Sequence, residues 1–281
     1  MYLGKLPPLR SRGVRPILIE MSTGNETLRP KQSGADYGYT TERAGVETVE
    51  RSASIVVPMV MRLFQPKGVL DLGCGAGDWL HVFQRNGVDE IAGYDGGWVP
   101  RESLKIPAAA FHPIDFYAAM PELPRVDIAI CLEVAEHVAE AIGAKMVTAL
   151  AKCADTIVWS AAIPGQGGSQ HINEQYQDYW VALFQTAGFA AFDLLRPSIW
   201  GNPGVSWYYQ QNMLVFANAA SQARHGLSPA PFVASLVHPR HYERVRNPKN
   251  YSMKQVLRNV PHYLTRRFRK PVEQTSDTPA R

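Results

Sequence analysis

The chain has 281 residues, of which 46% are hydrophobic, so it is long enough to bury a sizeable core. No apolar stretch approaches the ~20 residues that cross a bilayer, and the N-terminus shows no apolar run of the kind found in secretory signals. The formal net charge is +4, but residues 238–270 alone carry +9, from ten Lys or Arg and one acid, so the remainder is −5 and acidic.

The chain begins with residues 1–35, which are rich in Pro, Gly, Ser and Arg and for which we expect a flexible N-terminal arm. Apolar residues at helical spacing over residues 41–64 predict a helix that packs against a sheet. Five strand-like apolar runs follow, at residues 68–72, 90–94, 109–111, 126–132 and 156–161. Three helical segments are expected among these strands. The first spans residues 79–86, the second follows the fourth strand and runs through residue 151, and the third spans residues 174–187.

Two later apolar runs, at residues 189–195 and 212–218, are expected to pair antiparallel at the edge of the sheet. The alternation of strands and helices favours a parallel sheet with helices on both faces. We therefore predict an α/β fold, with a doubly wound, Rossmann-like, seven-stranded sheet that is mostly parallel and has an antiparallel edge strand. This domain is expected to span residues 36–225.

Residues 226–281 form a basic extension that several prolines divide into short pieces. Within it, residues 254–270 interleave apolar side chains with Lys and Arg, which is the pattern of a basic amphipathic segment. Two interpretations stay open. The segment is a solvated helix docked on the domain, or it contacts a membrane surface or another polyanion.

A glycine turn follows the strand at residues 68–72, within the run Val-Leu-Asp-Leu-Gly-Cys-Gly-Ala-Gly-Asp-Trp. Gly73, Gly75 and Gly77 allow a tight turn in which a ligand lies against bare backbone. A strand, a glycine turn and a helix N-terminus form the nucleotide-binding side of a doubly wound sheet. The spacing differs from the dinucleotide fingerprint, because Asp78 stands where that fingerprint has its third glycine.

The pattern Asp-x-Gly-x-Gly-x-Gly, from Asp71 to Gly77, resembles the first motif of class I S-adenosylmethionine (SAM)-dependent methyltransferases. The resemblance implies that Asp71 helps to hold the methionine end of SAM. A carboxylate at Asp95, after the second strand, can accept both ribose hydroxyls. By resemblance, Asp115 approaches the adenine amino group and Phe116 packs against the ring. The expected cofactor contacts are Asp71, Gly73, Cys74, Gly75, Gly77, Asp95, Gly96, Asp115, Phe116 and Glu133.

The run Cys-Leu-Glu-Val-Ala-Glu-His-Val follows the fourth strand. Glu133, Glu136 and His137 stand at i, i+3 and i+4, so on a helical turn they face one way. Since ligands bind at the carboxyl ends of such strands, these side chains are expected to point into the site. Two carboxylates and an imidazole suit a hard divalent cation, Mg²⁺ or Mn²⁺.

This Glu-x-x-Glu-His run is similar to one shared by small-RNA 3′-terminal 2′-O-methyltransferases and ubiquinone-pathway O-methyltransferases. In the RNA enzymes a later histidine also binds the metal, and His171 lies in the glycine-rich loop at residues 164–174. The resemblance thus implies a metal set of Glu133, Glu136, His137 and His171. Metal-free alternatives keep the same residues, with His137 or His171 as general base and Glu136 in support, or assign them a structural role.

The acceptor is expected to be a hydroxyl oxygen, because a base or a metal ion helps a hydroxyl to lose its proton. The longer run of motifs resembles a bacterial subgroup associated with small-molecule or saccharide methylation. Two alternatives are methylation of RNA and binding of SAM without methyl transfer. The acidic charge of the chain outside residues 238–270 argues against a nucleic-acid substrate. The chain has three cysteines and no Cys-x-x-Cys pair, so we expect a cytoplasmic protein with reduced thiols. If residues 254–270 bind lipid, we also expect a peripheral contact with a membrane.

Overall fold

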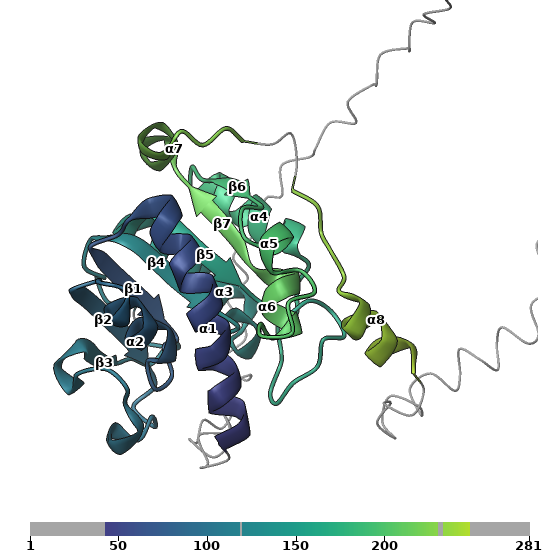
Figure 1. Ribbon diagram of the computed structural model, residues 1–281, viewed down its shortest axis with the longest axis horizontal. Coiled ribbons are helices and arrows are strands. Elements are labelled where there is room, and N and C mark those ends of the chain that lie inside the picture. Colours follow the sequence, from purple (N-terminus) through teal and green to yellow (C-terminus); the bar gives the residue numbers. More distant parts are fainter. Residues whose placement is uncertain (1–42, 119, 230–232, 248–281) are drawn as a thin grey trace, which may run out of the picture.

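The computed structural model describes residues 43–118, 120–229 and 233–247. These residues form a seven-stranded sheet with the order β3-β2-β1-β4-β5-β7-β6 (Figure 1). In chain order the strands are β1 Gly68–Leu72, β2 Glu90–Asp95, β3 Phe111–Pro113, β4 Val126–Leu132, β5 Ala154–Ser160, β6 Ala190–Phe192 and β7 Leu214–Ala217. The five strands from β1 to β5 are parallel, whereas β7 runs antiparallel to both β5 and β6.

The predicted fold class is confirmed, and β7 is the antiparallel strand, one position in from the edge strand β6. β1 and most of β4 are buried on both faces, which explains why they read as unbroken apolar runs rather than as alternating ones. Because strands β1 to β5 are parallel, Leu72, Asp95, Leu132 and Ser160 all end at the same edge of the sheet. That edge is where the site lies.

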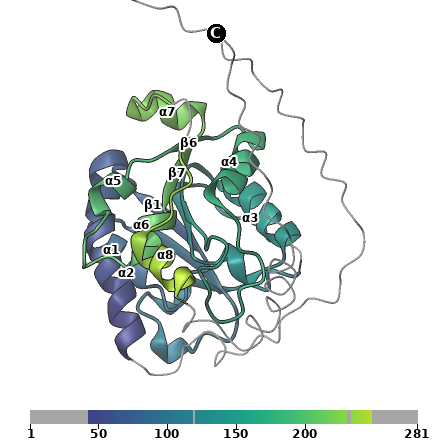
Figure 2. The same ribbon diagram turned by 90° about the vertical axis from the view of Figure 1, so that its right-hand side faces the viewer.

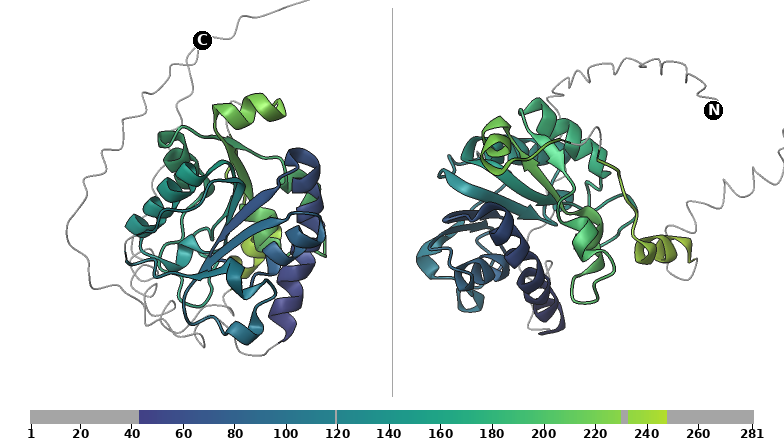
Figure 3. Two further views of the ribbon diagram at one scale, coloured as in Figure 1. Left: turned by 90° about the vertical axis from the view of Figure 1, so that its left-hand side faces the viewer. Right: turned by 45° about the horizontal axis from the view of Figure 1, so that its top comes forward.

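Helices cover both faces of the sheet (Figures 2 and 3). One face packs on α1 (Arg43–Phe64) and α2 (Asp78–Arg85), through residues such as Val56 and Phe83. The other packs on α3 (Glu140–Cys153) and α4 (Gln177–Thr186), through Met146 and Trp180. The shorter α helices are α5 Arg196–Ile199, α6 Trp207–Asn212, α7 Ala219–His225 and α8 Pro239–Arg246.

Some predicted boundaries were wrong. The helix expected from residue 174 begins at Gln177, because residues 164–176 form one long loop. The strand expected over residues 189–195 ends at Phe192, since the chain turns there into α5. Among the described residues, no helix is both long enough and apolar enough to cross a bilayer. The expected arm at 1–35 and the basic segment 254–270 lie outside the described residues.

Candidate functional site

The glycine turn between β1 and α2 has backbone angles that favour glycine. φ is +92° at Gly73, +56° at Gly75 and +88° at Gly77, all in the left-handed region. A Cβ at Gly73 would lie 2.3 Å from a methyl carbon of Val134, so this position has no room for a side chain. Backbone N–H groups of Gly73 and Cys74 donate to the carbonyl of Tyr94, which fixes the turn against the end of β2.

Asp95 closes the turn from the end of β2. Its two carboxylate oxygens accept hydrogen bonds from the backbone N–H groups of Gly75 (2.7 Å) and Gly96 (2.6 Å). Asp71 is buried at the end of β1, and its pKa lies well above the ordinary value because of burial and the nearby Asp95 charge. On the outer side, Lys105 joins Asp78 to Glu50 of α1 at 2.7 and 2.6 Å.

A cavity of about 580 Å³ opens beside this turn. All but three of the predicted site residues line it; the exceptions are Gly77, Gly96 and Asp115. The carboxylate of Asp115 instead accepts a hydrogen bond from the N–H of Tyr117, so it stabilises the turn after β3. Its neighbour Phe116 lines the cavity, and the contact of Asp115 with adenine stays a prediction.

Three lining residues are outside the sets expected from the sequence: Val49, Trp98 and Gln166. Tyr208 and Tyr209, from the aromatic and amide-rich run at residues 207–212, line the cavity as well. Trp98 follows Asp95-Gly96-Gly97, and a Cβ at Gly96 would lie 2.0 Å from its ring. In the sequence, an aromatic residue directly after the acidic turn could have predicted that Trp98 lines the cavity. Val49 carried no such signal, because only packing of α1 over the edge of the sheet brings it there.

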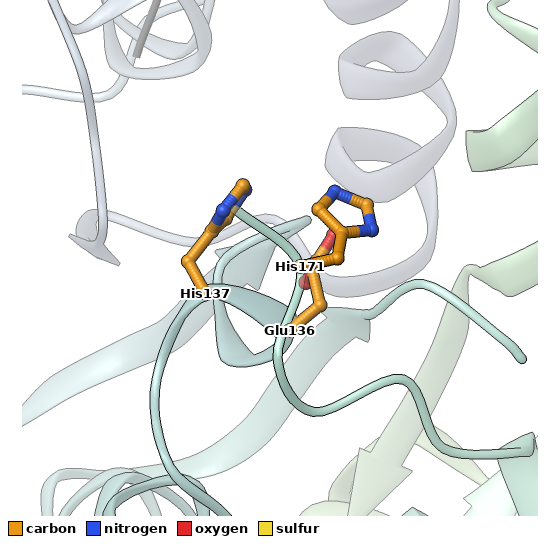
Figure 4. Close-up of side chains that lie close together, drawn as sticks. All are labelled: Glu136, His137 and His171. Carbon is orange, nitrogen blue, oxygen red and sulfur yellow. The ribbon is translucent and has the colours of Figure 1, made fainter. Parts of the chain in front are cut away.

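Three side chains of the cavity wall lie close together: Glu136, His137 and His171. One potential ligand atom from each lies within 4.8 Å of the others (Figure 4). Glu136 and His137 belong to a single 3₁₀ turn, η4 (Ala135–His137), after β4. His171 comes from the loop after β5, which is tied to this turn because the N–H groups of Ile172 and Asn173 donate to the Glu136 carbonyl.

Burial dominates the electrostatics of this group. Glu136 is 1% exposed, and neither carboxylate oxygen has a hydrogen-bond partner among the described residues. Burial and the nearby Glu133 charge hold the pKa of Glu136 well above its ordinary value. Burial and the neighbouring His171 lower the pKa of His137 to about 4, so this imidazole is neutral at physiological pH. Nδ1 of His171 lies 2.9 Å from Oε1 of Glu174.

Glu133 is not in this group of three. It follows β4 with a left-handed φ of +57°, so it does not share a helical turn with Glu136 and His137 as predicted. Its carboxylate accepts hydrogen bonds from Gln166 Nε2 (2.7 Å) and Asn212 Nδ2 (3.0 Å). Burial raises the pKa of Glu133, and the two amide donors act in the opposite direction.

Buried amides connect Glu133 to the C-terminal segment. Oε1 of Gln166 accepts from Gln211 Nε2 (3.1 Å) and Asn212 Nδ2 (2.9 Å). Oε1 of Gln211 in turn accepts from the backbone N–H of His238 (2.9 Å). Residues 233–247, which the sequence placed in a separate extension, are therefore bonded to the wall of the cavity.

Comparison with known proteins finds one family model that is similar to the first part of this fold. Residues 47–160 match a family model described as a methyltransferase domain. No curated protein sequence matches the chain.

Solved structures are similar at low identity. The methyltransferase domain of bacterial CtHen1-C is 18% identical over 60% of this chain and 98% of its own, with a TM-score of 0.45. Human N-acetylserotonin methyltransferase, solved with SAM, is 15% identical over 59% and 51%, with a TM-score of 0.43. A sugar N-methyltransferase from a Streptoalloteichus species is 15% identical over 60% and 87%, with a TM-score of 0.47.

The residues at the turn fit SAM. The turn leaves bare backbone where Cβ atoms would collide, and Asp95 stands at the end of the neighbouring strand, where a ribose binds in such sheets. The cavity is also within the size range of sites that enclose a small molecule. Residues 47–160 therefore match a methyltransferase domain, and the residues of the glycine turn fit SAM as its cofactor.

Proposed function

We propose that this protein transfers a methyl group from SAM to a hydroxyl oxygen of a small molecule or sugar. The observation that carries the proposal is the group formed by Glu136, His137 and His171, which shares a cavity with the glycine turn. SAM, when bound, supplies a methyl group already activated by a sulfonium centre. The protein must hold an acceptor oxygen in line with it and help that oxygen to lose its proton.

The two histidines suit proton removal. His137 is neutral at physiological pH, since its pKa is about 4, and it presents a lone pair for a hydrogen bond or a cation. When His171 donates from Nδ1 to Glu174, its Nε2 carries the lone pair, as in base–carboxylate pairs in which the carboxylate fixes the tautomer. The acceptor's proton goes to one of these nitrogens as the oxygen bonds to the methyl carbon and the carbon–sulfur bond breaks.

A divalent cation fits among the same three side chains. A buried carboxylate without a hydrogen-bond partner lacks a compensating charge, and a cation among Glu136, His137 and His171 supplies one. One carboxylate with two imidazoles favours Mn²⁺ over Mg²⁺, because Mg²⁺ prefers oxygen ligands alone. An ion there supplies Lewis acidity that lowers the pKa of a bound hydroxyl.

A small or saccharide acceptor is supported by an aromatic residue of the cavity wall. The ring of Tyr208 lines the cavity, and an aromatic ring suits the face of a sugar ring. Tyr209 lies deeper and receives a hydrogen bond from Trp79, so it forms the floor rather than the contact surface.

The proposal is tested by turnover of the full chain with SAM and a panel of hydroxylated acceptors, with release of S-adenosylhomocysteine as the readout. We expect Glu136→Ala and His171→Ala to lower turnover at least ~100-fold while SAM affinity stays within ~threefold. His225→Ala, on α7 and away from the cavity, is the matched control. Equal turnover in all variants would overturn the site, and methylation of RNA alone would overturn the acceptor class.

The cation is tested separately. The protein is stripped with a chelator and assayed before and after addition of Mn²⁺, Mg²⁺ or Zn²⁺. We expect activity to return best with Mn²⁺ and not to return in the Glu136→Ala variant. Full activity in excess chelator would rule out the cation and leave the histidines as bases.

A further inference from the structure

Exposed hydrophobic side chains are concentrated on one part of the molecule. Seven large hydrophobic residues are exposed in the described ranges, and six of them lie on the loop before α4, near α5, or in the segment that leads into α8 and α8 itself. We call these six residues the rim: Ile172, Tyr176, Trp200, Val237, Tyr242 and Val245. They are between 38% and 56% exposed. The seventh residue, Leu63, lies near the end of α1, shortly before the start of β1. It is therefore near the amino end of that strand, whereas the site lies at the carboxyl ends of the strands.

The segments that carry the rim contact one another. A methyl carbon of Val245 lies 3.4 Å from the ideal Cβ position of Gly165, which places α8 on the loop after β5. The N–H of Asp178 donates to Ser235 Oγ, and the rings of Trp200 and His238 lie 4.9 Å apart. α8 also lies beside α6 (Figures 1 and 2). The rim therefore lies on and beside the loop after β5, and other residues of that loop line the cavity.

α8 has one face for the protein and one for an outside partner. His241 is buried, with its ring stacked on Trp207 at 5.8 Å. Tyr242 and Val245 are exposed, together with the charged residues Arg240, Glu243, Arg244 and Arg246. Aromatic and aliphatic side chains among arginines are the composition of helices that lie in a membrane interface. A nucleic-acid surface would need the arginines but not the exposed aliphatic groups.

Charge on this face favours an anionic partner. Acids on these segments include Glu243, which lies 3.6 Å from Arg246, and Asp193, which is paired with the buried Arg196. Asp178 is exposed, and Glu174 is partly buried. Residues 248–270 follow α8 directly and add seven Lys or Arg without a single Asp or Glu. Basic residues next to an inserted apolar face strengthen binding to anionic lipids.

We propose that the rim docks this protein on an anionic membrane surface, with Tyr242 and Val245 of α8 inserted among the lipid headgroups. This extends the expectation for residues 254–270 to described residues beside the cavity. It is independent of the proposed methyl transfer, because docking needs neither SAM nor an acceptor. It also brings the loop wall of the cavity next to the lipid, where amphipathic hydroxylated molecules collect.

The test is co-sedimentation of the full chain with vesicles of phosphatidylcholine alone or mixed with phosphatidylglycerol. We expect binding to the anionic vesicles, weakened roughly tenfold in the double variant Tyr242→Ser, Val245→Ser. Leu63→Ser is the matched control, since it removes an exposed hydrophobic group away from the rim. Arg240→Glu with Arg246→Glu should abolish the preference for phosphatidylglycerol.

Each result is decisive. Thermal melting and SAM affinity, measured on every variant, show whether the fold is intact. If the double variant Tyr242→Ser, Val245→Ser bound vesicles as tightly as wild type, the rim would not be the docking surface. The basic residues after α8 would then be the remaining contact. Equal binding to neutral vesicles would overturn the anionic preference, and displacement of the protein from vesicles by RNA at low concentration would identify nucleic acid as the partner instead. Because no step needs turnover, failure of methyl transfer would leave this result readable.

Discussion

Gln166 donates a 2.7 Å hydrogen bond to the carboxylate of Glu133, and this contact joins the loop after β5 to the end of β4. Both residues line the cavity. The loop carries His171, and β4 leads into the turn that carries Glu136 and His137, so this bond helps to hold the three side chains in register. The site therefore depends on an amide that lies outside the predicted cofactor and metal sets.

Replacement of Gln166 by Leu should uncouple the two segments. The change removes one donor to a buried carboxylate and three acceptor contacts, so we expect the free energy of unfolding to fall by about 1–3 kcal/mol. Urea denaturation measures this loss. Gln185→Leu, on the exposed side of α4, makes the same chemical change at the surface and should stay within about 0.5 kcal/mol of wild type. Equal effects of the two substitutions would contradict a role for the buried network.

Gly73 and Gly87 allow backbone strain to be separated from steric exclusion. Both have a φ of +92°, but a Cβ at Gly73 meets Val134 at 2.3 Å, whereas a Cβ at Gly87 meets nothing within 4 Å. Gly87→Ala should cost about 1–2 kcal/mol of stability and leave SAM affinity unchanged. Gly73→Ala should cost more and also abolish SAM binding, measured by calorimetry. Unchanged SAM affinity in Gly73→Ala would show that this backbone does not face the cofactor.

Binding of Mn²⁺ to the proposed cation site should tighten as pH rises. Burial and Glu133 raise the pKa of Glu136, so in mildly acidic solution Glu136 holds a proton that must leave before a cation binds. His137 adds little, since its pKa of about 4 keeps it neutral above that pH. We expect affinity to increase by up to about tenfold per pH unit while Glu136 remains protonated. Calorimetry in buffers of different ionisation enthalpy detects the released proton, and pH-independent affinity would argue against Glu136 as a ligand.

The Lys105 bridge between Glu50 and Asp78 should stabilise the fold above the ordinary pKa of Glu50 and lose that effect in acid. The hydrogen bond from Lys105 lowers the pKa of Glu50, so its contribution is present above the ordinary pKa and is lost as pH falls through the lowered value. Lys105→Met should therefore reduce the free energy of unfolding by about 1 kcal/mol near pH 7 and by less near pH 3. Arg85→Met, whose guanidinium lies 3.9 Å from Glu50 and is exposed, serves as the control. A pH-independent loss would point to packing of the lysine stem instead.

The sheet was predictable from sequence because its central strands are buried on both faces. β1 and β4 read as unbroken apolar runs, and the glycine turn after β1 has few structural alternatives. Asp95 was predictable for a different reason, since it stands at the carboxyl end of β2. These features depend on local sequence and on one general rule about where parallel strands end.

Other parts of the site depend on contacts between distant segments, which no local pattern encodes. Helical spacing suggested that Glu133 faces the same way as Glu136, but the backbone takes a left-handed turn at Glu133 and its carboxylate meets Gln166 and Asn212. The docking of His238 on Gln211 was also beyond reach, since the prolines around it suggested a separate extension.

The amides between His238 and Glu133 all donate in one direction. The N–H of His238 donates to Gln211, Gln211 donates to Gln166, and Gln166 donates to Glu133. A backbone amide near the end of the described chain thus reports on a carboxylate in the cavity. The exchange of the His238 amide with deuterium should slow when the site is occupied and become faster when Glu133 loses its hydrogen bond from Gln166. Hydrogen exchange at His238 can therefore detect ligands that do not contact this residue.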